Sequence, residues 1–173
     1  MTNCVISFKS KAVLLTLYKS LVRPHLEYYT PAWSPYYEKD KSLLEKVQHR
    51  FTRMIPGLNA LSYENRLNIL GLWSLEERRN RTDLLEMFKM FIGVSSVRFD
   101  SIFELSTNRN TRGHTLKVVK HRSRLDLRKY FFSEHVISRW NSLEQYCIQK
   151  TTINGFKQSL NEKRKKDKGF FMD

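Results

Sequence analysis

The sequence has few of the residues on which several classes of protein depend. It contains only two cysteines, Cys4 and Cys147, too few for a disulfide framework or a cysteine-rich zinc site. Six glycines and four prolines exclude a collagen-like or low-complexity chain. No stretch approaches the roughly 20 consecutive apolar residues of a membrane helix, and the first residues lack the apolar run of a secretory signal. We therefore expect an intracellular protein of the nucleus or cytoplasm, with no membrane partner.

The motifs of common catalytic sites are absent as well. The glycine-rich phosphate-binding patterns G-x-x-x-x-G-K and G-x-G-x-x-G do not occur. None of the five histidines lies beside a cysteine at metal-ligand spacing. No Asp-Asp pair occurs, and two-metal nucleotidyl transfer needs converging carboxylates. Glu76-Glu77 fits the first turn of a helix, and Cys147 fits a buried apolar position. The sequence thus predicts no catalytic residue, no metal site and no cofactor.

Positive charge is abundant and unevenly distributed along the chain. Lysine and arginine number 31 against 17 acidic residues, so the formal net charge is +14, which attracts polyanions. Residues 1–60 carry net +5, residues 61–110 are neutral, and residues 111–173 carry net +9. The composition also changes at Ser106, where a polar, turn-like stretch begins. Charge and composition together divide the chain into N-terminal helices (1–60), a helical scaffold (61–105) and a basic C-terminal region (106–173).

The hydrophobic periodicity is mostly helical, which predicts a mostly α fold. A helix beginning near Ser10 should end before Pro24, and residues 30–35, with two prolines, predict a rigid connector. Residues 38–55 form the clearest helix, with a stripe spanning about 120° that should face the core. That stripe consists of Leu43, Leu44, Val47, Phe51, Met54 and Ile55.

Helix boundaries are marked by local signals farther along the chain. Ser62 to Leu70 predicts a short helix that Gly71 ends. Ser74 and Glu77 form a capping box for a helix reaching about Ile92. Residues 115–119 suggest a short strand. A helix should follow from about residue 127, with Phe132, Val136, Trp140 and Leu143 on one face, and Thr152 should cap the last helix.

Two basic clusters stand out. On the helix at 38–55, Lys39, Lys46, Arg50 and Arg53 fall within about 60° of one another. This row can meet phosphates, or it can be a solvated face with snorkelling side chains. The second cluster runs from Arg112 to Lys129, with seven lysines or arginines and one acid. Guanidinium groups there can bind phosphate in pairs of hydrogen bonds.

Two neighbouring segments leave alternatives open. Tyr130, Phe131 and Phe132 can stack on bases, although core packing is the better expectation for the two phenylalanines. The run from Lys163 to Lys168 is either a nuclear localisation signal or a solvated tail.

A series of short motifs follows one order along most of the chain. It begins with the segment from Leu17 to Tyr28 and continues through Pro31-Ala32-Trp33-Ser34-Pro35-Tyr36, Leu44-Glu45-Lys46-Val47-Gln48 with Arg50, and 51–58. Further motifs, in the same order, are Leu61-Ser62-Tyr63-Glu64, Arg66-Leu67, Leu70-Gly71-Leu72, Ser74-Leu75-Glu76, Arg78-Arg79, Arg81, Thr111-Arg112-Gly113-His114, Arg122-Ser123-Arg124, Arg128, Phe131-Phe132 and Trp140-Asn141-Ser142-Leu143. Together these motifs, over roughly residues 5–160, resemble the reverse transcriptases of non-LTR (LINE-type, jockey-like) retrotransposons. Tyr29 stands where the family often has Cys, and Glu144 where it often has Pro.

The resemblance implies a thumb, with the C-terminal region that follows it, from an RNA-directed DNA polymerase. The family's catalytic Asp-Asp motif lies upstream and is not in this chain, so polymerase ancestry is implied without polymerase activity. The implied fold is a helical thumb bundle at 1–60, then a small helical region with a possible short β element near 112–120. The implied partner is RNA, DNA or their hybrid, bound through phosphates without sequence preference, and a palm domain if the product is longer.

Two contact strips follow from the basic clusters and this implied partner. The first comprises Lys19, Arg23, Lys46, Arg50 and Arg53. The second comprises Arg112, His114, Lys117, Arg122, Arg124 and Arg128.

Three alternatives to this interpretation stay open. The chain can be part of a longer enzyme that includes the palm, or the product of a decayed element that does nothing. It can also be a domesticated protein-interaction module, which predicts an exposed apolar patch of several hundred Å².

Overall fold

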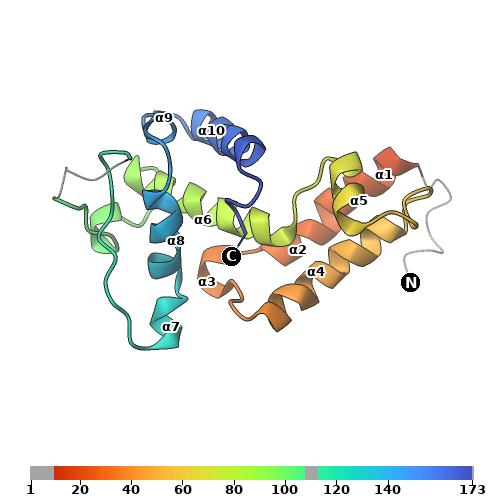
Figure 1. The fold of residues 1–173 in the computed structure, drawn as a ribbon, viewed down its shortest axis with the longest axis horizontal. Coiled ribbons are helices and arrows are strands. Elements are labelled where there is room, and N and C mark those ends of the chain that lie inside the picture. Colours follow the sequence, from red (N-terminus) through yellow and green to blue (C-terminus); the bar gives the residue numbers. More distant parts are fainter. Residues whose placement is uncertain (1–9, 108–112, 173) are drawn as a thin grey trace. The chain divides into compact units, whose positions relative to one another are not determined.

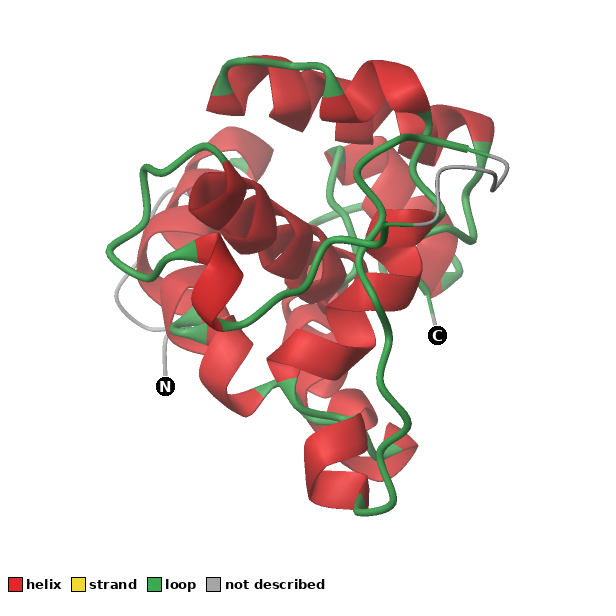
Figure 2. Cartoon of the chain, turned by 90° about the vertical axis from the view of Figure 1, so that its left-hand side faces the viewer, coloured by secondary structure: helices red, strands yellow, loops and turns green. Residues whose placement is uncertain are grey.

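The structure, a computed structural model, describes residues 10–107 and 113–172. Within them the fold is mostly α-helical, which confirms the predicted class; Figure 2 shows helices joined by loops. The helices form two compact units. Unit 1 comprises the described residues of Met1–Tyr29 together with Pro35–Arg78, and unit 2 comprises Thr30–Ser34 with the described residues from Arg79 onward. The predicted division at residues 60 and 105 follows charge and composition, whereas these units follow packing.

Unit 1 begins with three consecutive helical segments, α1 (Lys11–Leu17), the π-helical segment η2 (Tyr18–Val22) and α2 (Arg23–Glu27), drawn in red to orange in Figure 1. The prediction that the helix ends before Pro24 is wrong. The Arg23 amide donates to the Tyr18 carbonyl, five residues back, so the turn is widened there. Pro24 then occupies the first turn of α2, where a helix tolerates a residue without an N–H group.

The other helices of unit 1 are α4 (Glu38–Arg53), α5 (Tyr63–Leu70) and the first turn of α6 (Leu75–Phe91). The predicted boundary signals are confirmed. The Ser62 hydroxyl accepts from the Asn65 amide at the start of α5, and Gly71 ends that helix with a left-handed φ of 60°. The capping box also forms, because the Ser74 amide donates to Glu77 at 3.0 Å and the Glu77 amide donates to the Ser74 hydroxyl at 3.1 Å.

Unit 2 contains α3 (Thr30–Trp33), the rest of α6, the 3₁₀ turn η3 (Phe99–Ser101), α7 (Asp126–Lys129), α8 (Phe132–Asn141), α9 (Gln145–Ile148) and α10 (Ile153–Lys166). Residues 30–33 are thus a helical turn, where a connector was predicted. The core has large buried side chains, with the Phe88 ring stacked on Phe156 at 4.1 Å. Cys147 is buried as predicted, and the Thr152 hydroxyl caps α10 through the Gly155 amide.

The predicted helix from residue 127 is divided between α7 and α8. Tyr130 and Phe131 lie between the two helices, and Phe131 has an extended backbone at the start of α8. The predicted inner face of α8 is confirmed, since Phe132, Val136, Trp140 and Leu143 are all buried. Phe131 is 52% exposed, so the prediction that it packs in the core is wrong.

The predicted strand at 115–119 is reduced to a single antiparallel bridge between Leu105 and Val118, in the residues that the structure describes. The second edge of this segment pairs with a side chain. The Val118 amide donates to the Asn141 side-chain oxygen at 2.9 Å, and the Asn141 amide group donates to the Val118 carbonyl at 2.8 Å. The Trp140 indole also donates to the Leu116 carbonyl at 2.9 Å. Side chains at the C-terminal end of α8 therefore make the backbone hydrogen bonds that a neighbouring strand would make, and they hold this segment in position.

We predict that Asn141→Leu destabilises unit 2 by about 2–4 kcal/mol, because two backbone groups of the buried Val118 lose their partners. Urea unfolding followed by circular dichroism measures this loss. Ser142→Ala on the neighbouring exposed residue is the control, with an expected change below about 0.5 kcal/mol. Equal effects of the two substitutions would contradict the role given to Asn141.

Candidate nucleic-acid interface

The orientation of α4 decides which side chains unit 1 presents to solvent. The predicted core stripe is only half correct. Ile55, just beyond the helix, is buried, and Leu44 and Phe51 are partly buried, but Leu43, Val47 and Met54 are exposed. The buried face of the helix itself consists of polar side chains: Lys41, Gln48 and Thr52.

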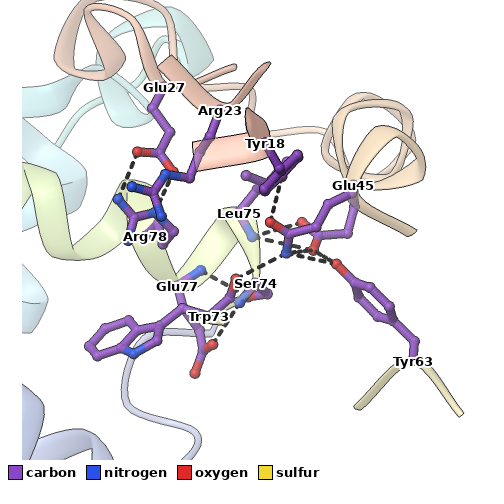
Figure 3. Close-up of polar contacts among 11 residues, drawn as sticks. Tyr18, Arg23, Glu27, Glu45, Tyr63, Trp73, Ser74, Leu75, Glu77 and Arg78 are labelled. Atoms are coloured by element: carbon purple, nitrogen blue, oxygen red, sulfur yellow. Dashed lines mark hydrogen bonds and ion pairs between the residues drawn. The ribbon is translucent and has the colours of Figure 1, made fainter. Parts of the chain in front are cut away.

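Gln48 lies at the centre of this polar face and is fully buried. Its side-chain oxygen accepts from the Tyr18 hydroxyl at 2.7 Å. Its amide nitrogen lies 3.0 Å from both the Tyr63 hydroxyl and the Trp73 carbonyl. One side chain thus joins η2, α4, α5 and the segment before α6. Its three partners, Tyr18, Tyr63 and Trp73, are labelled in Figure 3.

Glu45, one turn before Gln48, holds the beginning of α6. Its carboxylate accepts from the Leu75 amide at 3.0 and 3.2 Å and from the Tyr63 hydroxyl in a short hydrogen bond (Figure 3). A carboxylate at a helix N-terminus is stabilised by the exposed amides and the helix dipole. Burial, then the nearby Glu45 charge, raise the pKa of Tyr18 and of Tyr63, so both hydroxyls stay protonated and keep donating.

Arg66 of α5 makes a second polar connection to α4. Its Nε donates to the Thr52 hydroxyl at 3.1 Å, and one terminal nitrogen donates to the Leu61 carbonyl at 2.8 Å. The other terminal nitrogen lies 3.2 Å from Nδ1 of His49. Because arginine only donates, this contact favours a neutral His49 ring. Burial, followed by the charges of Arg66 and Arg53, lowers the pKa of His49.

Two ion pairs attach the neighbouring helices to the first turn of α6. Arg78 binds the Glu27 carboxylate through two nitrogens, one of them at 2.8 Å (Figure 3). Lys41 contacts Glu76 at 2.7 Å. Arg23 also contacts Glu27, at 3.7 Å, and burial followed by the Arg78 charge lowers the pKa of Arg23. Arg23, a predicted phosphate contact, therefore has its charge partly neutralised within unit 1.

The opposite face of α4 carries the remaining residues of the first predicted strip. Lys46, Arg50 and Arg53 are exposed, and so is Lys39. Among the described residues, none of these four side chains forms an ion pair or a hydrogen bond. Lys19 of η2 is exposed too. Because the polar network holds the other face of α4 inward, this row of charges points to solvent.

The structure corrects one residue of the second predicted strip. His114 is only 2% exposed. Its Nε2 lies 2.9 Å from the Trp140 carbonyl, and its Nδ1 accepts from the Leu116 amide. Burial lowers the pKa of His114. A neutral ring that donates at one nitrogen and accepts at the other fits the core, so His114 is not placed to contact phosphate.

The other residues of that strip have different surroundings. Arg122, Arg124 and Arg128 are exposed, whereas Lys117 is partly buried. Arg112 lies outside the described residues. The second strip therefore retains a basic surface on the three arginines between 122 and 128.

Sequence reasoning missed Gln48, Tyr63 and Arg66, which organise unit 1. The hydrophobic periodicity does not mark them, because a polar side chain contributes nothing to a hydrophobic stripe.

No group of three or more metal-ligating side chains occurs in the described part of the chain. No helix there is both long and apolar enough to cross a membrane. In comparisons with models of known protein families, with curated proteins and with solved structures, nothing matches this chain.

We predict that Gln48→Met destabilises unit 1 by about 2–4 kcal/mol. Methionine has a similar volume but leaves the buried Tyr18 hydroxyl and the Trp73 carbonyl without their partner. Urea unfolding followed by circular dichroism measures the change. Lys46→Met on the exposed face of the same helix is the matched control, expected within about 0.5 kcal/mol of the wild type. A Gln48 variant as stable as this control would contradict the role of the network.

Acidification should also destabilise the protein. The pKa values of His49 and His114 are lowered on folding, so their neutral forms are favoured in the folded state. Their contribution is complete above the ordinary value of 6.5 and is lost as the pH falls through the folded values. The free energy of unfolding, measured in urea, should be lower at pH 5.5 than at pH 7.5. Between these two pH values the His114→Gln variant should lose less of its free energy of unfolding than the wild type. An equal or larger loss in the variant would contradict the role given to His114.

Proposed function

We propose that this chain is the thumb and C-terminal region of a non-LTR retrotransposon reverse transcriptase and that it binds RNA, DNA or their hybrid through phosphates. The observation that carries the proposal is the row of exposed, unpaired cations on α4, formed by Lys39, Lys46, Arg50 and Arg53. Contacts with the phosphate backbone do not depend on base sequence, so the binding should not either.

The dimensions of the row suit a nucleic-acid backbone. At 1.5 Å per residue, Lys39 and Arg53 lie about 21 Å apart along the helix axis. Phosphates along one strand of a duplex are spaced by about 3.4 Å of axis, so the row spans roughly six nucleotides. The helix that carries these charges is fixed on its far face by hydrogen bonds, so its backbone needs little ordering on binding.

Unit 2 supplies a second basic surface through Arg122, Arg124 and Arg128. Guanidinium groups bind phosphate through paired N–H donors, which suits them to this role. Each unit thus has its own exposed cations, and each can contribute to the affinity for a polyanion separately.

Under this proposal the chain itself is not an enzyme. The family's Asp-Asp motif does not occur in the sequence, so the chemistry of DNA synthesis would belong to a palm domain in a longer product. The protein would act within the cell, in the nucleus or cytoplasm, where its nucleic-acid partners are. A decayed, non-functional element is the competing interpretation, and it predicts no loss when the basic residues are neutralised.

We predict strongly salt-dependent binding. If six to ten phosphates are contacted, the affinity for a labelled oligonucleotide should fall about 10³–10⁵-fold between 50 and 200 mM salt. The triple variant Lys46→Gln, Arg50→Gln and Arg53→Gln should reduce the slope of log affinity against log salt by about two to three. Fluorescence anisotropy of single-stranded RNA, DNA and hybrid duplexes measures both quantities.

A control with the same loss of charge separates a specific surface from net charge. Lys150, Lys165 and Lys168 are exposed in unit 2, and their replacement by Gln should change the slope much less. Equal losses for the two triple variants would mean that net charge alone attracts the nucleic acid. A flat salt dependence, or no binding at low salt, would overturn the proposed function.

A further inference from the structure

The exposed face of α4 also carries an apolar row that phosphate binding does not require. Leu43 is 51% exposed, and Val47 and Met54 are each 40% exposed. Arg50 lies between Val47 and Met54 in this row, so the successive spacings from Leu43 to Met54 are four, three and four residues. This is the spacing of the a and d positions at which one helix of a coiled coil meets another.

A line of positive charge runs beside this row. Lys39, Lys46 and Arg53 are seven residues apart, and Lys46 and Arg53 each directly precede an apolar residue of the row. They therefore occupy the flanking position that pairs with charges on a partner helix. The opposite flank holds Leu44 and Phe51, which are partly buried within unit 1. The side that is open to a partner is thus uniformly basic.

These charges define the chemistry of a partner. A second copy of α4 packed antiparallel would place Lys39, Lys46 and Arg53 against the same residues of its neighbour, and like charges repel at such positions. A chain with net charge +14 also repels its own copies. A polyanion alone would leave the apolar row in water. A helix with an apolar stripe and an acidic flank would cover the row and neutralise the charges.

We propose that the exposed face of α4 is a docking site for an acidic amphipathic helix of another protein. Leu43, Val47 and Met54 supply the apolar contact, and Lys46 and Arg53 select carboxylates on the partner. The site uses two of the cations assigned to phosphate binding, so helix docking and nucleic-acid binding at α4 compete. The apolar row is the part that belongs to helix docking alone.

Three synthetic peptides of 21 residues test this proposal against the full chain. The first has leucine at heptad a and d positions and glutamate at e and g. The second contains the same residues in scrambled order, and the third replaces glutamate by lysine. Fluorescence anisotropy at 150 mM salt should show binding of the first peptide only. Equal binding of the scrambled peptide would overturn the proposal, because charge alone would then explain the affinity.

A variant of the apolar row separates this site from the proposed function. Leu43→Ser, Val47→Ser and Met54→Ser together should weaken the first peptide at least tenfold and leave the affinity for an RNA oligonucleotide within twofold. All three residues are exposed, and circular dichroism verifies that the fold is retained. An unchanged peptide affinity, or an equal loss for peptide and RNA, would overturn helix docking. A failure of RNA binding in the wild type, with peptide binding intact, would instead remove the proposed function alone.

Discussion

The buried side chain of Gln48 is the contact on which the arrangement of unit 1 depends. An amide removed from water without partners destabilises a fold by several kcal/mol, but here both ends of the amide are satisfied, by the hydroxyls of Tyr18 and Tyr63 and the carbonyl of Trp73. These partners come from three other segments of the chain. The contact therefore specifies how these segments meet and which face of α4 turns inward.

The consequence is a helix whose polar and apolar sides are partly exchanged. Gln48 and Thr52 are inside, and Leu43, Val47 and Met54 are outside beside a row of cations. A satisfied hydrogen-bond network can outweigh the burial of a few aliphatic side chains, because breaking it would leave several buried groups without partners. The outer face that results is the basis for both the nucleic-acid interface and the helix-docking site that we propose.

Local chemistry was predictable from the sequence, and long-range hydrogen bonding was not. Ser62, Gly71 and the Ser74–Glu77 capping box act within a few residues of themselves, so their roles could be inferred directly. The rotation of α4 could not be inferred in this way. It depends on the hydrogen bond between Gln48 and Tyr18, which are 30 residues apart in the chain, and a hydrophobic pattern does not reveal such a bond. His114 shows the same limit in unit 2. Its place in a basic stretch predicted a phosphate contact, but Trp140 and Leu116 hold it in the core.

The orientation of α4 is the central claim, and cysteine accessibility measures it most directly. In a Cys4→Ser background, where the remaining Cys147 is buried, cysteine is introduced at Val47 or at Thr52, and its reaction with a soluble thiol reagent is timed. The account predicts that Val47→Cys reacts at nearly the rate of an unfolded peptide, and that Thr52→Cys reacts only when unit 1 unfolds. Fast labelling at residue 52 with protection at residue 47 would show that the apolar stripe faces inward, and it would contradict the account.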